Sequence, residues 1–502
     1  MCKSRNAVRR ASGESDEIRP DKSCRGTERQ LQVVRRVLGV DRRPTTVLEV
    51  ALTKPVTTGV AALLAALALA PAAAAAATTL GAAADSGVES ALPDDEVGPD
   101  WPARPLMDVM PESLSVSTAD GANADGSPAT IPVALTVSGP GCSRVASLAA
   151  AQSEVRAGRD ACLADGAYSG AVKLSTSAAS RVTLSAEHPG RAQISGLVTL
   201  DSHTAIDGLD LTSSASDCVR ISTAQTDIAV LDSTLHDCGR DGIRWARPAL
   251  DGSNESSNVL VSGNVIRNVA WNSITVRGDA ATVTSNELTG STNDAVTLWG
   301  DGHVFRSNYI HDYSNTVGNH NDAFQTWGGD DDGFHGAPLT NLVIEANRIV
   351  NILGADAHGF MVSGENSDLT IRRNLWWNIG SHALNLRPGQ TNVDGLYNTF
   401  VHTGIVQYNS GTSGRIVGNV FSDVRPYYVT GCICTLGYNL AATWTPDETH
   451  GLQADPTFAG PSDFHLQATS AAVDSGDEAT VPPTDIDGKP ANGAPDRCAY
   501  ER

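Results

Sequence analysis

The feature that most constrains this chain is a short phrase that recurs through its second half. In this phrase an Asn is followed within a few residues by apolar ones, as in NVIRNV at Asn264 and NRIVNI at Asn347. A period in the twenties with variable inserts is typical of stacked units, each too small to bury its apolar face alone. We therefore predict a solenoid in which the Asn side chains form a ladder between neighbouring coils. The phrase recurs at steps of 21 to 39 residues, at Gly208, Ser233, Asn264, Asn286, Asn308, Asn347, Asn374, Asn398 and Asn419.

Each repeat carries a second short strand that begins at a polar residue, which we number position zero. Positions two and four of this strand are almost always apolar, as Val296 and Leu298 are, and this period of two predicts that they are buried. Positions one, three and five are then expected to face outward. Small residues at position one, such as Ala295 and Ala323, would leave the floor of a channel. Position zero is occupied by Asp217, Asp241, Asn272, Asp294, Asp322, His358 and His382.

Composition supports an all-β protein and excludes some partners. Aromatic residues make up 5% of the chain and Gly is abundant at 47 residues, which suits short strands and turns. The formal net charge of −21 repels nucleic acid and anionic membrane surfaces, so we expect neither as a partner. A bound polyanion would need a local basic patch.

The N-terminal part differs from the rest. Residues 1–54 are rich in Arg, and an apolar run from Val56 to Ala70 precedes an alanine tract that ends near Ala77. This order predicts a signal peptide and a secreted protein rather than a membrane anchor. We expect four regions, namely an extension with signal peptide (1–77), a disordered linker (78–130), the solenoid (131–440) and a C-terminal cap (441–502).

The chain has nine cysteines, and secretion would allow disulfides. We expect two local bonds, Cys142–Cys162 and Cys218–Cys238. Cys498 is expected to pair with Cys432 or Cys434.

The chain resembles the pectin-lyase-like right-handed parallel β-helix proteins. The segment CSRVASLAAAQSEVRAGRDACLADGAYSG from Cys142 is similar to their opening unit, and ADPTFAGPSDFHLQATSAAVDSGD, TDIDGKP and DRCAYE are similar to a common closing unit. The resemblance covers residues 140–502. It implies an all-β, single-stranded right-handed parallel β-helix with an N-terminal capping helix and an irregular C-terminal cap. Activity does not follow, because hydrolases, lyases, epimerases and adhesins share this scaffold.

Position zero is the first place to look for chemistry. Asp294 and Asp322 lie on consecutive coils, so their backbones should be about 5 Å apart. Such a pair suits the acid and base or nucleophile of a glycoside hydrolase. His358 and His382 follow on the next two coils, where either could be the general base of a lyase. The spacing His320-x-Asp322-x-x-Gln325 resembles a motif of secreted β-helix proteins thought to act on carbohydrates.

Outward positions predict a surface that binds sugar. Trp299 and Trp327 occupy position five on neighbouring coils and would form an aromatic platform for pyranose rings, unless a loop covers them. Asp330, Asp331 and Asp332 could hold a Ca²⁺ ion or form a solvated loop tip; no other cofactor is expected. Further candidate substrate-binding residues are Gln325, Arg244, Arg277, Asn385 and Arg387.

Two classes of function fit these residues. The first is a monomeric, secreted enzyme that degrades a polysaccharide, and we favour a lyase of a uronic-acid polymer that uses His and Arg, with Ca²⁺ as a possible helper. A hydrolase using Asp294 and Asp322 is the alternative within this class. The second class is a non-catalytic protein that binds glycans at a surface.

Overall fold

Short parallel strands stacked on three faces make up most of the described chain. The computed structural model describes residues 114–122, 128–133, 141–246, 255–314, 320–327, 338–424, 431–491 and 493–502. The chain divides into two compact units, residues 1–94 and 95–502, and every described residue lies in the second. The expected signal peptide, the N-terminal part of the expected linker and Asp330–Asp332 lie outside the described residues.

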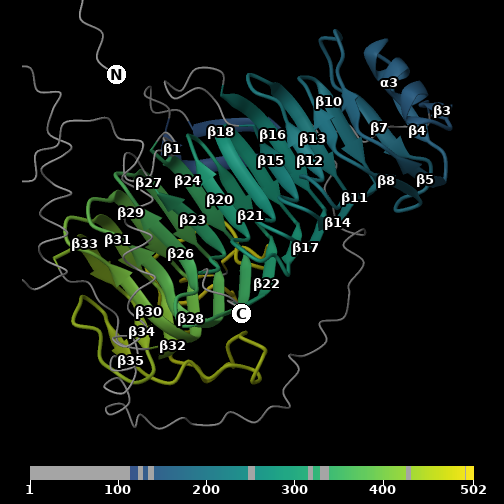
Figure 1. The fold of residues 1–502 in the computed structure, drawn as a ribbon. Helices are drawn as coiled ribbons and strands as arrows, with labels where there is room; N and C mark the ends of the chain where they lie inside the picture. Colours follow the sequence, from purple (N-terminus) through teal and green to yellow (C-terminus); the bar gives the residue numbers. More distant parts are fainter. Residues whose placement is uncertain are drawn as a thin grey trace, which may run out of the picture. The chain divides into compact units, whose positions relative to one another are not determined.

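The chain visits the three faces in turn and pairs each strand with the one a coil earlier, so that the strands run side by side along the stack (Figure 1). The first face contains β3 (Ser143–Val145), β4 (Ala161–Leu163), β7 (Val182–Ala186), β10 (Thr204–Asp207), β13 (Thr226–Leu231), β16 (Ser256–Ser262), the second half of β18 (Ile274–Thr284), β21 (Val304–Arg306), β24 (Thr340–Glu345), β27 (Ser367–Arg372), β29 (Thr391–Leu396), β31 (Ser413–Val417) and β33 (Ile433–Gly437). The second face contains β5 (Gly166–Ser169), β8 (Ala192–Ser195), β11 (Asp210–Ser213), β14 (Thr234–Cys238), β17 (Val265–Val269), β19 (Glu287–Thr289), β22 (Tyr309–Ser314), β25 (Arg348–Leu353), the first halves of β28 (Leu375–Leu386) and β30 (Thr399–Tyr408), β32 (Val420–Val424), β34 (Leu440–Ala441) and β35 (Leu452–Gln453). The third face contains β6 (Val172–Leu174), β9 (Val198–Leu200), β12 (Val219–Ile221), β15 (Ile243–Trp245), the first half of β18, β20 (Val296–Trp299), β23 (Phe324–Trp327), β26 (His358–Ser363) and the second halves of β28 and β30.

The register of the third face is the one that the sequence predicts. Ile274 pairs with Val296, Val296 with Phe324, and Phe324 with Phe360. These position-two residues are fully buried, as are Leu298 and Val362 at position four. Each coil therefore contributes its apolar residues to one continuous core, and the predicted stacking is confirmed.

The predicted Asn ladder is confirmed. The side-chain oxygen of each Asn accepts the backbone N–H of the Asn one coil earlier; for example, Asn308 N donates to Asn347 Oδ1 at 2.9 Å. The ladder runs without a break from Asn264 to Asn419 and continues to Asn439. The residue before each Asn often has a positive φ, such as 53° at Arg373 and 54° at Tyr397. These buried amides provide hydrogen-bond partners for the main-chain N–H and C=O groups where the chain turns.

Position one faces the core, which corrects the expectation of a channel floor. Ser273, Ala295, Ala323 and Ala383 are all completely buried. They lie at the bend just before each third-face strand, where two successive residues point inward and strict alternation fails. Small residues are needed there: a Cβ at Gly359 would lie 2.7 Å from a ring carbon of Trp376.

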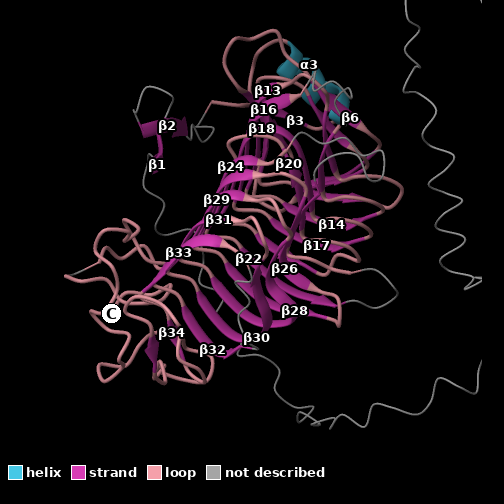
Figure 2. Cartoon of the chain, turned by 90° about the vertical axis from the view of Figure 1, so that its left-hand side faces the viewer, coloured by secondary structure: helices cyan, strands magenta, loops and turns pink. Residues whose placement is uncertain are grey.

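One helix, α3 (Leu148–Arg156), begins at the N-cap Ser147 and lies at the N-terminal end of the stack (Figure 2). It buries Ala151 and Val155. Its role as a cap stays a prediction. Across the expected boundary between linker and solenoid at residue 130, β1 (Leu114–Ala122) pairs with β2 (Pro128–Val133) in an antiparallel ribbon. Among the described residues, no helix has the length and apolar character that a membrane crossing needs.

The C-terminal segment is irregular, as expected, but it lies along the second face as well as at the end of the stack. Ala499 N donates to Thr399 Oγ1, and Arg373 forms a buried ion pair with Glu501. A separate apolar cluster joins the segment to the strands through residues such as Leu375 and Tyr500.

The disulfide predictions are confirmed for Cys142–Cys162 and Cys218–Cys238. The expected partner of Cys498 is wrong, because Cys432 and Cys434 are bonded to each other and Cys498 is a buried free thiol. Cys434 lies on the first face, whereas Cys498 belongs to the apolar cluster against the second.

Candidate functional site

The position-zero residues form a second ladder, which we call the corner column: Asp217, Asp241, Asn272, Asp294, Asp322 and His358. Each Asp or Asn accepts the backbone N–H of the next member through Oδ1. The N···O distance is 3.0 Å from Asp322 to Asp294 and 2.9 Å from His358 to Asp322. All six residues are buried. The column is therefore buried at the corner before the third face, and its hydrogen bonds give part of its Asp and Asn content a structural reason.

The counter-charges of the column change along the stack. Asp217 is paired with Arg220, whose Nη2 lies 2.6 Å from Oδ2, and Arg244 Nε lies 3.6 Å from Asp241. Both arginines come three residues after their carboxylate. At the same position after Asp294 and Asp322 the chain has Thr297 and Gln325. Two histidines take the place of an arginine beside Asp322.

These histidines bind Asp322 from two sides. His358 Nδ1 lies 2.9 Å from Oδ1, and His320 Nδ1 lies 3.2 Å from Oδ2. Asp322 is completely buried and His358 is 5% exposed, whereas the His320 side chain is 41% exposed. The hydrogen bond to Asp322 raises the pKa of His320 to about 9. His320 is therefore a cation at neutral pH, held at the surface by a buried carboxylate.

His382 lies on the next coil and has the opposite electrostatic character. Its ring centroid is 5.1 Å from that of His358, and its Nδ1 lies 2.9 Å from Ser381 Oγ. Burial lowers the pKa of His382, and the charge of His358 lowers it further. We call His320, Asp322, His358 and His382 the histidine centre. The stacking brings together all five residues that the sequence predicted as catalytic, since Asp294 lies directly beneath Asp322.

Asp294 is completely buried. Its Oδ2 accepts a hydrogen bond from Thr297 Oγ1 at 3.1 Å, and its Oδ1 accepts the Asp322 N–H. Burial raises the pKa of Asp294 well above the usual value, and the charge of Asp322 raises it further. Neither carboxylate of the predicted pair reaches the surface.

The predicted sugar platform needs correction. Trp299 and Trp327 do lie side by side, with ring centroids 4.8 Å apart. Trp299 is only 3% exposed, however, because Arg277 covers its ring at 4.8 Å and its Nε1 donates to Trp327 O. It offers no open face to a sugar.

The other predicted binding residues are spread over several coils. Gln325 Nε2 lies 3.4 Å from His320 Nε2, next to the histidine centre. Asn385 is buried on β28, in register with Met361. Arg387 is exposed just after β28, and its charge contributes to the lowered pKa of His382. Arg244 lies farther along the stack, beside Asp241.

His320, Asp322 and His358 each offer one ligand atom, and these atoms lie within 4.8 Å of one another. Two imidazoles and one carboxylate suit a transition ion better than Ca²⁺, which prefers oxygen ligands throughout. The two Nδ1–carboxylate hydrogen bonds account for the same closeness without an ion. The expected Ca²⁺ ligands Asp330, Asp331 and Asp332 lie outside the described residues and stay a prediction.

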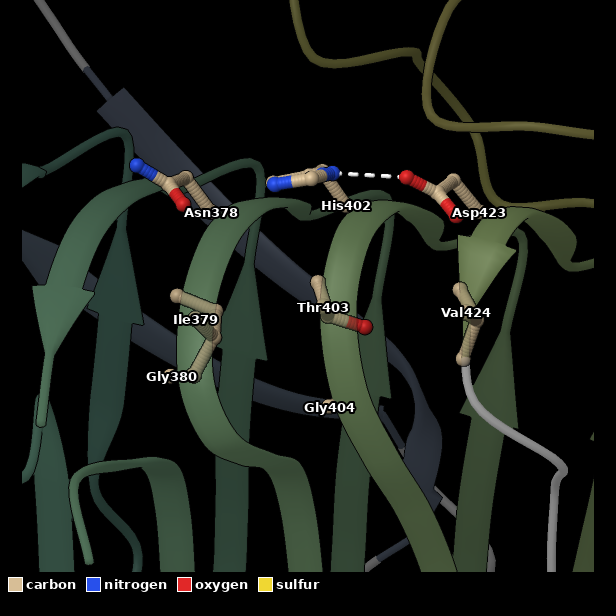
Figure 3. A pocket seen from close by; sticks show the side chains of 8 residues that line it. All are labelled: Asn378, Ile379, Gly380, His402, Thr403, Gly404, Asp423 and Val424. Atoms are coloured by element: carbon tan, nitrogen blue, oxygen red, sulfur yellow. Dashed lines mark hydrogen bonds and ion pairs between the residues drawn. The ribbon is translucent and has the colours of Figure 1, made fainter. Parts of the chain in front are cut away.

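Two features near the centre were missed in the sequence. Trp271 is 44% exposed, and its place directly before Asn272 in the aligned repeats could have revealed it. A hollow of about 290 Å³ opens beside β28, β30 and β32 (Figure 3). Asn378, His402 and Asp423 lie in a row along its rim, with His402 Nδ1 2.6 Å from Asp423 Oδ2. All three have positive φ and come four residues after a ladder Asn.

Comparisons with known proteins agree with this architecture. Residues 251–421 match the family model described as a right-handed β-helix region. The fold of the described strands is a right-handed parallel β-helix. No curated protein matches its sequence.

Solved structures share the β-helix at low identity. Pectate lyase Pel9A is 15% identical, with a TM-score of 0.43 over 70% of this chain and 90% of that one. The surface adhesin PfbA of Streptococcus pneumoniae is 12% identical, with a TM-score of 0.39 over 59% and 84%. An alginate lyase from Paenibacillus sp. is 17% identical, with a TM-score of 0.34 over 50% and 98%. At this distance the likeness concerns the fold alone.

Proposed function

We propose that this β-helix protein is a lyase that cleaves a uronic-acid polysaccharide at the histidine centre. The observation that carries the proposal is the placement of Asp322, a completely buried carboxylate that binds His320 through one oxygen and His358 through the other. At Asp217 and Asp241 of the corner column, arginines three residues later fill this role. A change from arginine to histidine at one point of a repeated structure supplies groups that can exchange protons near neutral pH.

The opposite pKa shifts of the two histidines support a role for each. His320, with its pKa raised to about 9, remains protonated, while His382, with its pKa lowered, remains neutral. Neighbouring groups whose pKa values are driven apart can act as acid and base. His382 is therefore the base and His320 the cation of the proposed reaction.

The reaction follows from these roles. His382 takes the proton from C5 of a uronate, and the electron pair of that C–H bond forms a C4–C5 double bond. The C4–O bond breaks, and the departing oxygen takes a proton from water. Negative charge gathers on the uronate carboxylate before the bond breaks, and the His320 cation and exposed Arg387 stabilise it there.

A hydrolase built on Asp294 and Asp322 has less support. Its acid must touch the glycosidic oxygen, and its partner must reach the anomeric carbon or a water. Both carboxylates are fully buried and use their oxygens to bind the chain's own groups. A non-catalytic glycan binder is the remaining alternative, and activity measurements distinguish it.

The test is the release of unsaturated uronate, followed by ultraviolet absorbance, from a panel of acidic and neutral polysaccharides. We expect activity on an acidic polymer, with His382→Ala and His320→Ala each lowering kcat by at least about 100-fold. His188→Ala is the matched control, because the His188 side chain is 63% exposed and lies between β7 and β8, in the first coils of the stack, and it should keep full activity. Absence of unsaturated product from every acidic polymer, or an active His382→Ala, would contradict the proposal.

Treatment with a chelator distinguishes proton transfer by histidines from a reaction that depends on a metal ion. Proton transfer by His320 and His382 needs no ion, so we expect activity to survive dialysis against EDTA. Activity that is lost on dialysis and restored by a divalent cation would replace the acid–base account.

We also propose that the protein is secreted as a monomer after cleavage near Ala77. Two disulfides within the β-helix, Cys142–Cys162 and Cys218–Cys238, support an oxidising compartment. N-terminal sequencing of protein from the culture medium tests the cleavage, and a start upstream of residue 56 would contradict it.

A further inference from the structure

Trp271 is a large apolar side chain left open to solvent near the histidine centre. It is 44% exposed, whereas Trp299 and Trp376 are buried. Trp271 N donates to Arg240 O at 3.0 Å, and Trp271 O accepts the N–H of Asn293. It therefore lies on the coil between Arg240 and Asn293, at the corner that precedes the third face.

This corner leads directly to the histidine centre. Asn293 is followed one coil later by Asn321, the residue between His320 and Asp322, and Asn321 Nδ2 donates to Asn293 O at 3.1 Å. Two steps of about 4.8 Å separate the coils of Trp271 and His320, a distance of about 10 Å. A glycan lying along the corner would pass over both.

Arginines gather on the other side of Trp271. Arg220, Arg240 and Arg244 lie on two neighbouring coils, and Arg240 is exposed. Arg220 and Arg244 are register partners on adjacent strands, and both approach Asp217, with Arg220 Nη2 2.6 Å and Arg244 Nη1 3.9 Å from Oδ2. Burial lowers the pKa of Arg244, and the charges of Arg240 and Arg220 lower it further.

The carboxylates of these coils balance the arginines only in part. Asp217 pairs with Arg220, and Asp241 lies near Arg244. Burial raises the pKa of Asp241 to about 6, with help from the charge of Asp217. Within the described part of these coils, three arginines thus lie near two carboxylates, in a chain whose net charge is −21. This is the local basic patch that an acidic protein needs to hold a polyanion.

We propose that Trp271 and the arginine cluster of Arg220, Arg240 and Arg244 form a binding subsite for an anionic sugar unit of the polysaccharide. The C–H face of the pyranose ring packs on the Trp271 indole, and the carboxylate of that unit meets Arg240. The identity of the polymer in this inference rests on the proposed function. The subsite itself is defined by binding and can be tested without turnover. It lies on the N-terminal side of the histidine centre and takes a sugar beyond the one that reacts.

Binding without turnover tests the subsite. In the His382→Ala background, the dissociation constant for polygalacturonate and for alginate is measured by affinity electrophoresis and by tryptophan fluorescence. We expect Trp271→Ala and Arg240→Gln each to weaken binding of the preferred polymer about tenfold, with Trp271→Phe restoring most of the loss. Leu353→Ala is the control, because Leu353 is 40% exposed on the second face, and it should bind like the parent.

A neutral ligand distinguishes the contribution of Trp271 to binding from that of Arg240. Methyl esterification of the polygalacturonate removes its charge and keeps the rings. Arg240→Gln should then have no effect, while Trp271→Ala should still weaken binding. Raising the salt concentration should weaken binding of the charged polymer less in Arg240→Gln than in the parent.

The outcomes distinguish this inference from the proposed function. Binding that is unchanged in both Trp271→Ala and Arg240→Gln would overturn the subsite, even if His382→Ala abolishes lyase activity. If His382→Ala keeps its activity and Trp271→Ala loses binding, the subsite stands and the catalytic proposal falls. In the active enzyme, Trp271→Ala should raise KM for long polymers and leave kcat on short oligouronates unchanged.

Discussion

At the scale of single residues, one buried carboxylate organises the candidate site. Asp322 accepts hydrogen bonds from the His358 backbone, the His358 ring and the His320 ring. A buried charge is costly unless its hydrogen-bonding capacity is satisfied. Since no arginine follows three residues later, as Arg220 follows Asp217, the histidines must supply the donors. The same contacts that stabilise Asp322 thereby hold the proton of His320.

The pH dependence of the reaction follows from the two shifted histidines. His382 must be neutral and its pKa lies below 6.5, while His320 must be protonated and its pKa is about 9. We expect kcat/KM to be flat near neutrality, to fall on the acid side below pH 6.5 and to fall on the alkaline side near pH 9. In Asp322→Asn the hydrogen bond that raises the pKa of His320 is weakened, so the alkaline limb should move down toward 6.5. An alkaline limb that stays near 9 in this variant would contradict the role given to Asp322.

Sequence reasoning found these residues because their spacing repeats. It placed Asp294, Asp322, His358 and His382 on successive coils, and the structure agrees. It did not predict that Asp294 and Asp322 are buried, because their burial depends on contacts with the neighbouring coils, such as the Asp322 N–H on Asp294 Oδ1 and the His358 ring on Asp322. It also left open whether Trp299 is covered, and it passed over Trp271. Exposure at a turn depends on which neighbour covers the ring, such as Arg277 over Trp299, and a repeat pattern holds no information on that.

At the scale of elements, the Asn ladder fixes the coils against one another. Asn347 Nδ2 donates to Phe305 O, Glu345 O and Asn374 Oδ1, and its Oδ1 accepts from both the backbone and the side chain of Asn308. One side chain therefore satisfies groups from several neighbouring coils. This role could be predicted from the sequence, because an amide can both donate and accept at every step of a buried column.

Removing one Asn side chain from the ladder should destabilise the fold. We expect Asn347→Ala to lower the free energy of unfolding by about 3 kcal/mol, because it leaves several buried polar groups without partners. Asn351→Ala on the same strand is the control; its side chain is half-buried and donates to Asp312. The control should lose about 1 kcal/mol or less. Urea denaturation measures both, and equal losses in the two variants would contradict the structural importance of the ladder.

At the scale of the whole molecule, stacking turns separations of some two dozen residues into contacts. The resemblance to pectin-lyase-like proteins and the period together predicted this architecture. The path of the C-terminal segment was not predicted, because it has no repeat and packs through scattered contacts such as Arg348 with Asp487. The bond between Cys432 and Cys434 was not predicted for the same reason. The position of Cys498, and therefore its distance from these two cysteines, depends on the path of the C-terminal segment.

The Cys218–Cys238 bond should contribute to the stability of the stack. Both cysteines are buried in the core, and the bond spans 20 residues. Closing a loop of that length stabilises a protein by about 3 kcal/mol. We expect the double variant Cys218→Ala, Cys238→Ala to lose about that amount in thermal or urea denaturation. A double variant with the stability of the parent would show that stacking alone holds these coils.

The most direct test of the account is a crystal structure of His382→Ala with an acidic oligosaccharide. The account predicts that the sugar chain runs along the stack, across successive coils, from Trp271 past His320 to the position of His382 and toward the hollow beside His402. One uronate carboxylate should lie within hydrogen-bonding distance of His320. A chain bound on another face, or one that never approaches His320, would contradict the central claim that stacking assembles a single site from these residues.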